Sequence, residues 1–331
     1  MNKTMKISRA RAVKMSSTVP IEWLLKGDVS IQHQVHRDLL RSDAKILLKL
    51  QNKIAKQGWG ARFLSKQRAD GHWGRGFYQP KWTSTHYTLL DLKNIGLPST
   101  NEQARKSTCM IFDQAIGPDG GINYSNTPAT RRRGSDLCID GMVLNIASYF
   151  RVMHAQLKVI INLLLSKQMK DGGWNCAWHY GAVHSSLHTT ISVLEGFLEY
   201  RNTGSNYQIE NILKAEKKAV EFILKHYLCK SHRTGEIIDA KMLMLSYPSR
   251  WRYDVLRALD YLQFAEIKFD ARMRFALEVI LKKQAQNGKW PLQMKHTGAV
   301  HFDMEKIGQS SRWNTLRVLR VMQFYSDINA V

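Results

Sequence analysis

The side chains best suited to chemistry in this sequence gather where five helices are predicted to begin. Carboxyl and imidazole groups at these starts can transfer protons, and the catalytic candidates are Asp140, Asp254 and His86. Thiols and further imidazoles stand at the same places. Helices in regular positions are needed to bring these groups together.

The elements follow an internal repeat that ends on tryptophan. Three copies share the pattern Gln-x-x-(Asp/Asn)-Gly-x-Trp, at residues 67–73, 168–174 and 284–290. Weaker copies lie between them at Asp119-Gly120-Gly121 and Thr234-Gly235-Glu236, so the repeat spans about 50 to 60 residues. That length accommodates two helices and two connections. The glycine of each copy predicts a chain reversal through a positive φ.

Apolar residues at helical spacing predict one helix before each turn and a second helix after it. The second helices are expected over residues 83–94, 136–150, 185–200, 250–264 and 311–325, and a first helix lies near 31–40. Several of these second helices are apolar most of the way round, which is typical of helices buried on all sides. Strand signals are nearly absent. The sequence therefore predicts an all-α fold, an α/α toroid in which an outer ring of helices encloses an inner one.

Composition limits the class of protein. The chain has 331 residues with 44% hydrophobic content, which is globular, and a formal charge of +22. Four cysteines in so long a chain indicate reduced thiols and a cytoplasmic protein. No apolar run approaches the roughly 20 residues that a membrane span needs. Residues 1–20 are basic and are predicted to form a flexible arm, followed by a single domain over 21–331.

From Ile46 onward, the three Gln-and-Trp copies resemble those of the squalene–hopene and oxidosqualene cyclases and of the β subunits of protein prenyltransferases. The resemblance implies an α/α toroid with a central cavity that holds an isoprenoid. It is specific for architecture and much less so for reaction, because one fold hosts many chemistries. We expect the inner helices to surround an apolar hollow with polar side chains at its rim.

The family's alkene-protonating cyclases use an Asp-x-Asp-Asp acid, and this sequence has no such tetrad. Protonation of an alkene needs a strong acid tuned by its neighbours, which a lone Asp140 or Asp254 does not provide. The chain is also about half as long as a two-toroid cyclase is expected to be. Ordinary triterpene cyclisation is therefore disfavoured.

The prenyltransferase resemblance implies a zinc site instead. Those β subunits hold zinc through an Asp-x-Cys pair and a later histidine, a layout that Asp136, Cys138 and His188 match, one repeat apart. Such a set leaves a coordination position open, and Cys176 could replace Asp136. The alternative is that Cys138 is a small buried hydrophobe, Asp136 a helix N-cap and His188 a core histidine.

Aromatic and basic residues also gather at the predicted helix starts. The rings would supply apolar surface and cation–π support in a prenyl pocket, and the arginines could hold a diphosphate. Packing at helix ends and solvated surface are the respective alternatives. The substrate-binding candidates are Trp82, Tyr87, Trp178, Trp251, Tyr253, Trp313, Arg250 and Arg252, with Arg131-Arg132-Arg133 as further basic residues.

Two functions remain open from the sequence. The first is a prenyltransferase-like or terpene cyclase-like enzyme that binds an isoprenoid or another lipid-like molecule in the toroid cavity. The alternative is a toroid that binds such a molecule, or acts as a scaffold, without catalysis. The charge of +22 also fits peripheral attraction to an anionic membrane surface. It fits a second alternative as well, a nucleic-acid binder with a basic surface, although no nucleic-acid-binding module is recognisable.

Overall fold

The computed structural model describes residues 19–125 and 134–326. Nearly all of the basic arm predicted over residues 1–20, and the run Arg131-Arg132-Arg133, lie outside these described residues. The described part consists of helices, turns and a few isolated bridges. The domain boundary at residue 21 stays a prediction.

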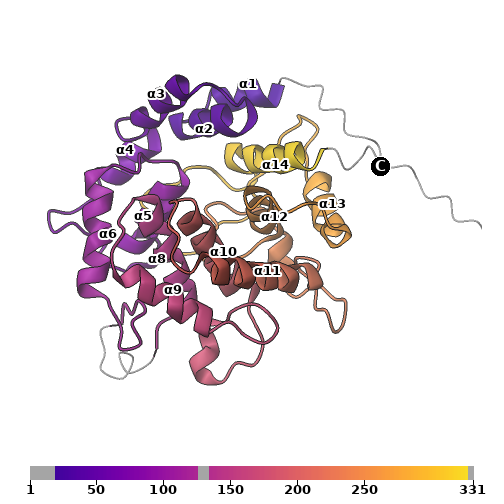
Figure 1. The fold of residues 1–331 in the computed structure, drawn as a ribbon. Coiled ribbons are helices and arrows are strands. Elements are labelled where there is room, and N and C mark those ends of the chain that lie inside the picture. The colour runs from indigo at the N-terminus through magenta and orange to yellow at the C-terminus, as the bar shows by residue number, and fades with distance from the viewer. Residues whose placement is uncertain (1–18, 126–133, 327–331) are drawn as a thin grey trace, which may run out of the picture.

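The helices form two concentric rings (Figure 1). The inner ring comprises α2 (Val29–Gln34) with the π-helix η1 (Val35–Leu39), α5 (Thr85–Asn94), α8 (Leu137–Tyr149), α10 (Leu187–Arg201), α12 (Val255–Phe264) and α14 (Arg312–Phe324). The outer helices are α1 (Val19–Leu25), α3 (Ala44–Ile54), α4 (Gly58–Leu64), α6 (Glu102–Gln114), α9 (Gln156–Ser166), α11 (Ile209–Lys225) and α13 (Arg274–Lys282). Short helical turns precede four of these helices: η2 (Lys81–Thr83), η3 (Cys176–Tyr180), η4 (Ala240–Leu243) and η5 (Ala271–Met273).

The predicted α/α toroid is thus confirmed, and the predicted second helices are the observed inner ones. Four of the five begin within two residues of the expected position. The exception is α12, which begins at Val255 and not at Arg250, because Arg250 adopts a positive φ of 55° and Asp254 caps the helix by accepting the N–H of Arg257 at 2.8 Å. The inner helices are buried on nearly all sides, and α8 and α10 approach closely where Gly141 and Gly196 leave no room for a Cβ atom.

The three Gln-and-Trp copies adopt one geometry. Each indole N–H donates to the carbonyl ten residues upstream at 2.7 Å, and each tryptophan backbone N–H donates to a threonine hydroxyl of the following inner helix. The glycines have φ between 75° and 102°. Gln67 and Gln168 also donate to the next outer helix, to the Ser107 hydroxyl and the Ala215 carbonyl at 2.8 Å. The motifs therefore join neighbouring repeats.

The last inner helix closes the ring on the first. The helix α14 contacts both α2 and η1. The Arg320 guanidinium on α14 bonds to Asp260 of α12 at 2.5 and 2.6 Å and to Asp38 of η1 at 2.9 Å. Next to Asp38, the Gln34 side chain donates to the Asn94 carbonyl at the end of α5 at 2.8 Å. One network of polar side chains thus spans four inner segments.

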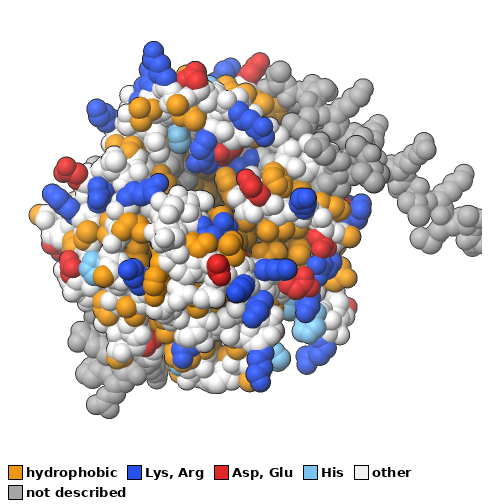
Figure 2. Space-filling view, viewed as in Figure 1, with side chains coloured by type: hydrophobic (Ala, Val, Ile, Leu, Met, Phe, Trp, Pro, Cys, Tyr) orange, Lys and Arg blue, Asp and Glu red, His pale blue; other side chains and the backbone are white. Residues whose placement is uncertain are grey.

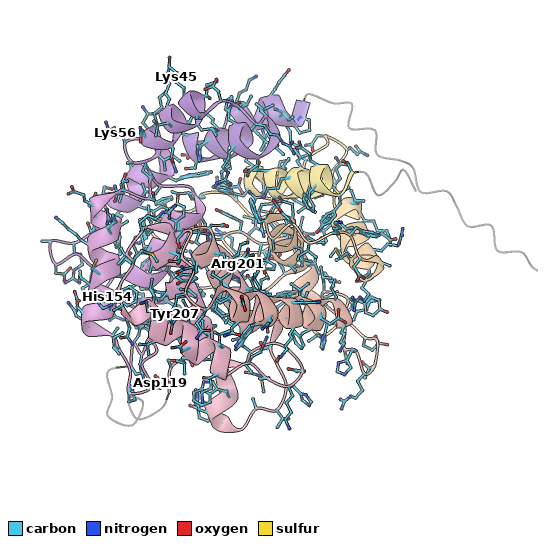
Figure 3. All side chains as sticks on the ribbon, in the orientation of Figure 1. Lys45, Lys56, Asp119, His154, Arg201 and Tyr207 are labelled. Carbon is cyan, nitrogen blue, oxygen red and sulfur yellow. The ribbon has the colours of Figure 1, made fainter. Side chains whose placement is uncertain are left out.

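Basic residues are distributed widely over the surface. Figure 2 shows Lys and Arg side chains among acidic and apolar ones across one face, with no single-sign patch on it. Lys45 and Lys56 point outward from the edge of the molecule (Figure 3). No helix among the described residues is both long and apolar enough to cross a membrane. Binding of nucleic acid or of an anionic membrane surface stays a prediction.

Candidate functional site

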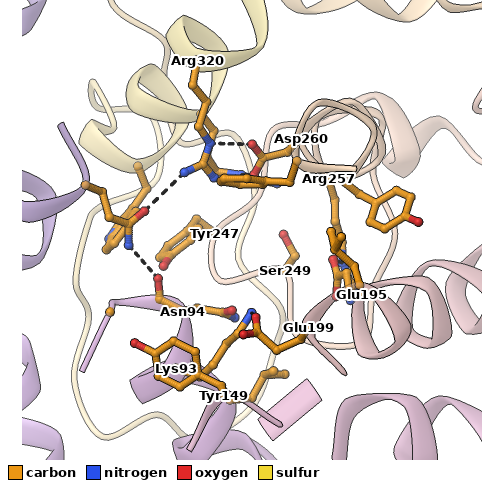
Figure 4. Close-up of a pocket in the computed structure, with 18 of the residues that line it drawn as sticks. Lys93, Asn94, Tyr149, Glu195, Glu199, Tyr247, Ser249, Arg257, Asp260 and Arg320 are labelled. Atoms are coloured by element: carbon orange, nitrogen blue, oxygen red, sulfur yellow. Dashed lines mark hydrogen bonds and ion pairs between the residues drawn. The ribbon is translucent and has the colours of Figure 1, made fainter. Parts of the chain in front are cut away.

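The centre of the toroid holds a cavity of about 350 Å³ (Figure 4). It lies against the C-terminal halves of α5, α8 and α10 and extends along α12 and α14, so every inner helix contributes to its wall. Its volume is within the range of small-molecule sites. The loop before α12 supplies Tyr247, Ser249 and Arg250.

The cavity wall is strongly charged. Of the 21 described residues that line it, nine carry charge and six of these are basic, so cations exceed anions in the described part of the wall. The basic residues are Arg37, Lys93, Arg250, Arg257, Arg317 and Arg320, and the acidic residues are Glu195, Glu199 and Asp260. The expectation of an apolar hollow is therefore wrong. The inner helices are apolar where they pack on one another, but many of their residues that line the cavity are charged.

Most of these charges are paired across the ring. Arg257 forms a two-pronged bond with Glu195 at 2.8 and 2.7 Å, and Lys93 lies 3.2 Å from Glu199. Asp260 accepts from both Arg317, at 3.1 Å, and Arg320. Paired, hydrogen-bonded charges hold their side chains in defined positions, so the wall is preorganised.

Arg250 is the least satisfied cation of the wall. It is 6% exposed, it stacks 4.6 Å from the Trp82 ring, and its nearest carboxylate, Asp91, lies 3.5 Å away. That distance is too long for a strong hydrogen bond. Among the described residues, neither the Arg250 Nε nor either Asp91 oxygen has a hydrogen-bond partner. Burial raises the pKa of Asp91 to about 6, against the opposing charge of Arg250.

Aromatic rings line the same side of the cavity. Trp313 stacks between Tyr247, at 4.5 Å between ring centroids, and Trp59, at 5.8 Å. Within the described part of the chain, the Tyr247 hydroxyl and the Trp313 indole N–H are buried without a hydrogen-bond partner. Buried donors are almost always paired in proteins. Together with Arg250, they are buried polar groups of residues that line the cavity.

Three of the predicted substrate-binding residues lie at these openings. Arg250 and Trp313 line the central cavity, and Trp82 joins Arg250 in a smaller adjoining pocket of about 30 Å³. Tyr87 and Tyr253 are instead buried in the core, where their hydroxyls bond to Tyr78 at 3.0 Å and to the Leu228 carbonyl at 2.6 Å. Neither lines either pocket.

The other aromatic and basic candidates gather around the starts of α5, α8 and α10. The Trp251 ring lies 5.3 Å from His188 and 4.7 Å from the Arg252 guanidinium. The indole N–H of Trp178 donates to the Ser135 carbonyl at 3.4 Å. The starts of adjacent repeats do converge, as the repeat predicts, but these three candidates do not line the cavity.

The three catalytic candidates are buried away from the cavity. His86 bonds to the Tyr124 hydroxyl at 3.1 Å, and burial lowers the pKa of His86 to about 3. Asp254 caps α12 and accepts the Ser246 hydroxyl at 2.6 Å. Asp140 accepts the Ile122 N–H at 2.6 Å and the Ser135 hydroxyl at 2.5 Å, and burial raises the pKa of Asp140 to about 7. Their catalytic role stays a prediction, and all three have structural partners.

The predicted zinc ligands are brought only partly together. The Cys138 backbone N–H donates to the Cys176 sulfur at 3.2 Å, but the His188 Nδ1 accepts the Tyr253 N–H at 2.8 Å. The contact with Cys176 and burial hold the pKa of Cys138 well above its usual range. In residues 19–125 and 134–326 no three His, Cys, Asp or Glu side chains form a metal-binding group. The residues as placed do not fit zinc, and its binding stays a prediction.

Several cavity residues were not foreseen from the sequence. They are charged residues within apolar stretches of inner helices, as in Leu90-Asp91-Leu92, and they could have been found by that signal. A charge on a helix that is otherwise buried must face a partner or a cavity. The missed residues are Asp91, Glu195, Glu199, Arg257, Asp260, Arg317 and Arg320.

Comparison with known proteins gives structural similarity alone. No protein-family model and no curated protein matches the sequence. Solved structures of the type II terpene cyclase MstE from Scytonema are similar in the complex with geranylgeranyl dihydroxybenzoate (16% identity, 91% of this chain and 87% of that chain, TM-score 0.45). The complex with merosterolic acid A is also similar (16% identity, 91% of this chain and 88% of that chain, TM-score 0.44). So is the apo form (16% identity, 92% of this chain and 90% of that chain, TM-score 0.43). Similarity at this level carries no conclusion about substrate or reaction.

Proposed function

We propose that this chain, a toroid of the terpenoid cyclase-like class, binds an isoprenoid-like molecule with an acidic head group in its central cavity. The observation that carries the proposal is the excess of basic over acidic side chains among the described residues of the cavity wall, six against three. Most of these charges are paired within the wall, but a plain hydrocarbon would leave Arg250 buried with no carboxylate closer than that of Asp91 at 3.5 Å. A phosphate or carboxylate would pair with Arg250.

The head group is proposed to lie at Arg250. Among the described residues, the one carboxylate that pairs with this guanidinium is that of Asp91, at 3.5 Å, and Tyr247 and Trp313 are lining residues whose hydroxyl and indole N–H are buried without a partner. Guanidinium groups bind phosphate and carboxylate oxygens by charge-assisted hydrogen bonds that are about twice as strong as neutral ones. The stack of Arg250 on Trp82 fixes its direction.

The apolar part of the ligand is proposed to lie further along the cavity. Several apolar and aromatic side chains from α5, α8, α10 and α12 line the wall between the charged pairs. Sites for amphipathic ligands combine such surface with a few fixed polar groups. The side chains concerned are Leu90, Tyr149, Leu198, Tyr261 and Phe264.

Replacing Arg250 with glutamine is expected to weaken binding of geranylgeranyl diphosphate by about 10- to 100-fold, since a hydrogen bond to a charged group contributes roughly 1.5–3 kcal/mol. Isothermal titration calorimetry on the full chain measures this change. The matched control is Arg274→Gln, an exposed arginine of α13 that also stacks on an aromatic ring, Phe269, at 5.7 Å. Geranylgeranyl dihydroxybenzoate, the substrate named for MstE, serves as a second acidic probe.

The neutral alcohol geranylgeraniol separates the two halves of the proposal. Tight binding of the diphosphate with little binding of the alcohol is the expected result. Equal affinity for both compounds contradicts an acidic head group at Arg250. No binding of any of the three probes contradicts the isoprenoid-like ligand altogether.

A second candidate function is acid catalysis on this ligand, favoured by one side chain. Asp91 is 2% exposed, its oxygens lack hydrogen-bond partners among the described residues, and burial raises its pKa to about 6, near the range of a working general acid. Asp91→Asn is expected to retain ligand binding and to abolish any product seen by mass spectrometry with the wild-type protein. Unchanged turnover by this variant contradicts the role, and absence of product in the wild type favours the non-catalytic alternative.

A further inference from the structure

Two histidine side chains meet on the outer surface, away from the central cavity. His226 follows the last residue of α11, and His232 lies in the loop that comes next. The His226 Nε2 and the His232 Nδ1 are 3.3 Å apart, and the two rings stand at 76° with centroids separated by 5.0 Å. The rings thus meet at nitrogen atoms, which are at hydrogen-bond distance when no metal is bound, and not as stacked faces.

The ring of His226 is fixed by a second hydrogen bond. Its Nδ1 lies 2.9 Å from the Phe222 carbonyl, which can only accept, so Nδ1 carries the proton and Nε2 carries the lone pair. Histidines that bind metals are usually oriented in this way, with the far nitrogen donating to a carbonyl or carboxylate. The Nε2 atom therefore presents a lone pair toward His232.

The loop that carries His232 is held closed by its backbone. The Gly235 N–H donates to the Ser231 carbonyl and the Ser231 N–H to the Glu236 carbonyl, both at 2.8 Å. The Ile238 N–H donates to the Cys229 carbonyl at 2.9 Å. These bonds fix the loop so that the exposed imidazole of His232 lies next to the half-buried imidazole of His226.

The separation of the two nitrogens matches a tetrahedral metal site. Two ligand nitrogens that each lie about 2.05 Å from a tetrahedral zinc ion are about 3.3 Å from one another, the distance observed here. We propose that His226 and His232 together bind a divalent transition-metal ion, with zinc as the reference metal and water in the remaining positions. On binding, His232 carries its proton on Nε2, which leaves Nδ1 free to coordinate.

The charges around the pair are compatible with such an ion. The negative charge of the Asp171 carboxylate acts on His226 and favours a positive charge there. No third His, Cys, Asp or Glu side chain joins the pair in the described part of the chain, and the His232 side chain is exposed.

The site is separate from the zinc ligands that the sequence predicts, and the experiment distinguishes them. Zinc is titrated into the metal-free full chain against a chromophoric chelator, for the wild type and for His226→Gln, His232→Asn and Cys138→Ser. His154→Gln is the matched control, because His154 is an exposed imidazole stacked on Phe112 at 5.0 Å. The expected result is one zinc ion per chain, lost in both His226 and His232 variants and retained in the other two.

A thermal unfolding series supplies an independent readout. Zinc is expected to raise the melting temperature of the wild type, because it binds the folded chain, and to leave that of His226→Gln unchanged. Equal melting temperatures of the two proteins without zinc establish that the variant is folded. The proposal is overturned if the wild type takes up no zinc, if the histidine variants retain it, or if Cys138→Ser alone loses it.

Discussion

Replacing Arg320 with leucine is expected to lower the free energy of unfolding by about 3 kcal/mol, the lower end of the range for breaking a buried ion pair from one side. The guanidinium is 9% exposed and joins Asp260 to Asp38 across the closure of the ring. Its removal leaves two carboxylates that are 11% and 8% exposed. Arg317 still pairs with Asp260 at 3.1 Å, and Arg37 still pairs with Asp38 at 2.5 Å. The expected loss of unfolding free energy is therefore at the lower end of the range.

The matched control for this change is Arg272→Leu. Arg272 likewise bonds to two carboxylates, Asp270 and Glu221 at 2.8 Å, but all three side chains are 29% to 46% exposed. Exposed pairs contribute about 0–1 kcal/mol because water and salt screen them. Urea unfolding followed by circular dichroism measures both variants. Similar losses for Arg272 and Arg320 would contradict a closure held by the buried network.

The fold was predictable because its signals are local. In each copy the glycine adopts a positive φ in the turn, and the tryptophan indole donates to the carbonyl ten residues upstream. These features depend on residues close together in the sequence. Inner helices that are apolar on most sides also imply burial between two layers. Only local departures, such as the late start of α12 at Val255, needed the structure.

The site was harder to predict because its signals are not local. Arg320 and Asp260 are 60 residues apart, and Arg257 and Glu195 are 62 apart, so no sequence window contains both partners. The repeat correctly places adjacent helix starts together, but it does not indicate which part of the ring remains hollow. The repeat therefore led to Arg250 and Trp313, which line the cavity, but not to the charged residues further along the inner helices, and the binding role of both residues stays a prediction.

Replacing Asp140 with asparagine is expected to stabilise the protein at alkaline pH and to have little effect in acid. In the folded chain burial raises the pKa of Asp140 to about 7 from a usual value of 3.8. Between those two values the folded state retains a proton that the unfolded state has lost, so the contribution of Asp140 to stability falls as pH rises through this window. Asparagine does not titrate, and its amide can replace the protonated carboxyl beside Ser135 and Ile122.

The size of the effect follows from the pKa difference. A displacement of about 3 units corresponds to about 4 kcal/mol, so the variant should exceed the wild type by this amount at pH 8 and should match it near pH 4. Urea unfolding of both proteins at a series of pH values measures the difference between their free energies of unfolding. Groups that titrate alike in both proteins do not contribute to this difference. Asp43→Asn is the control, an exposed carboxyl that also accepts a backbone N–H, at 2.9 Å from Ile46. A stability difference for Asp140→Asn that does not change with pH would contradict a buried, proton-retaining carboxyl at this position.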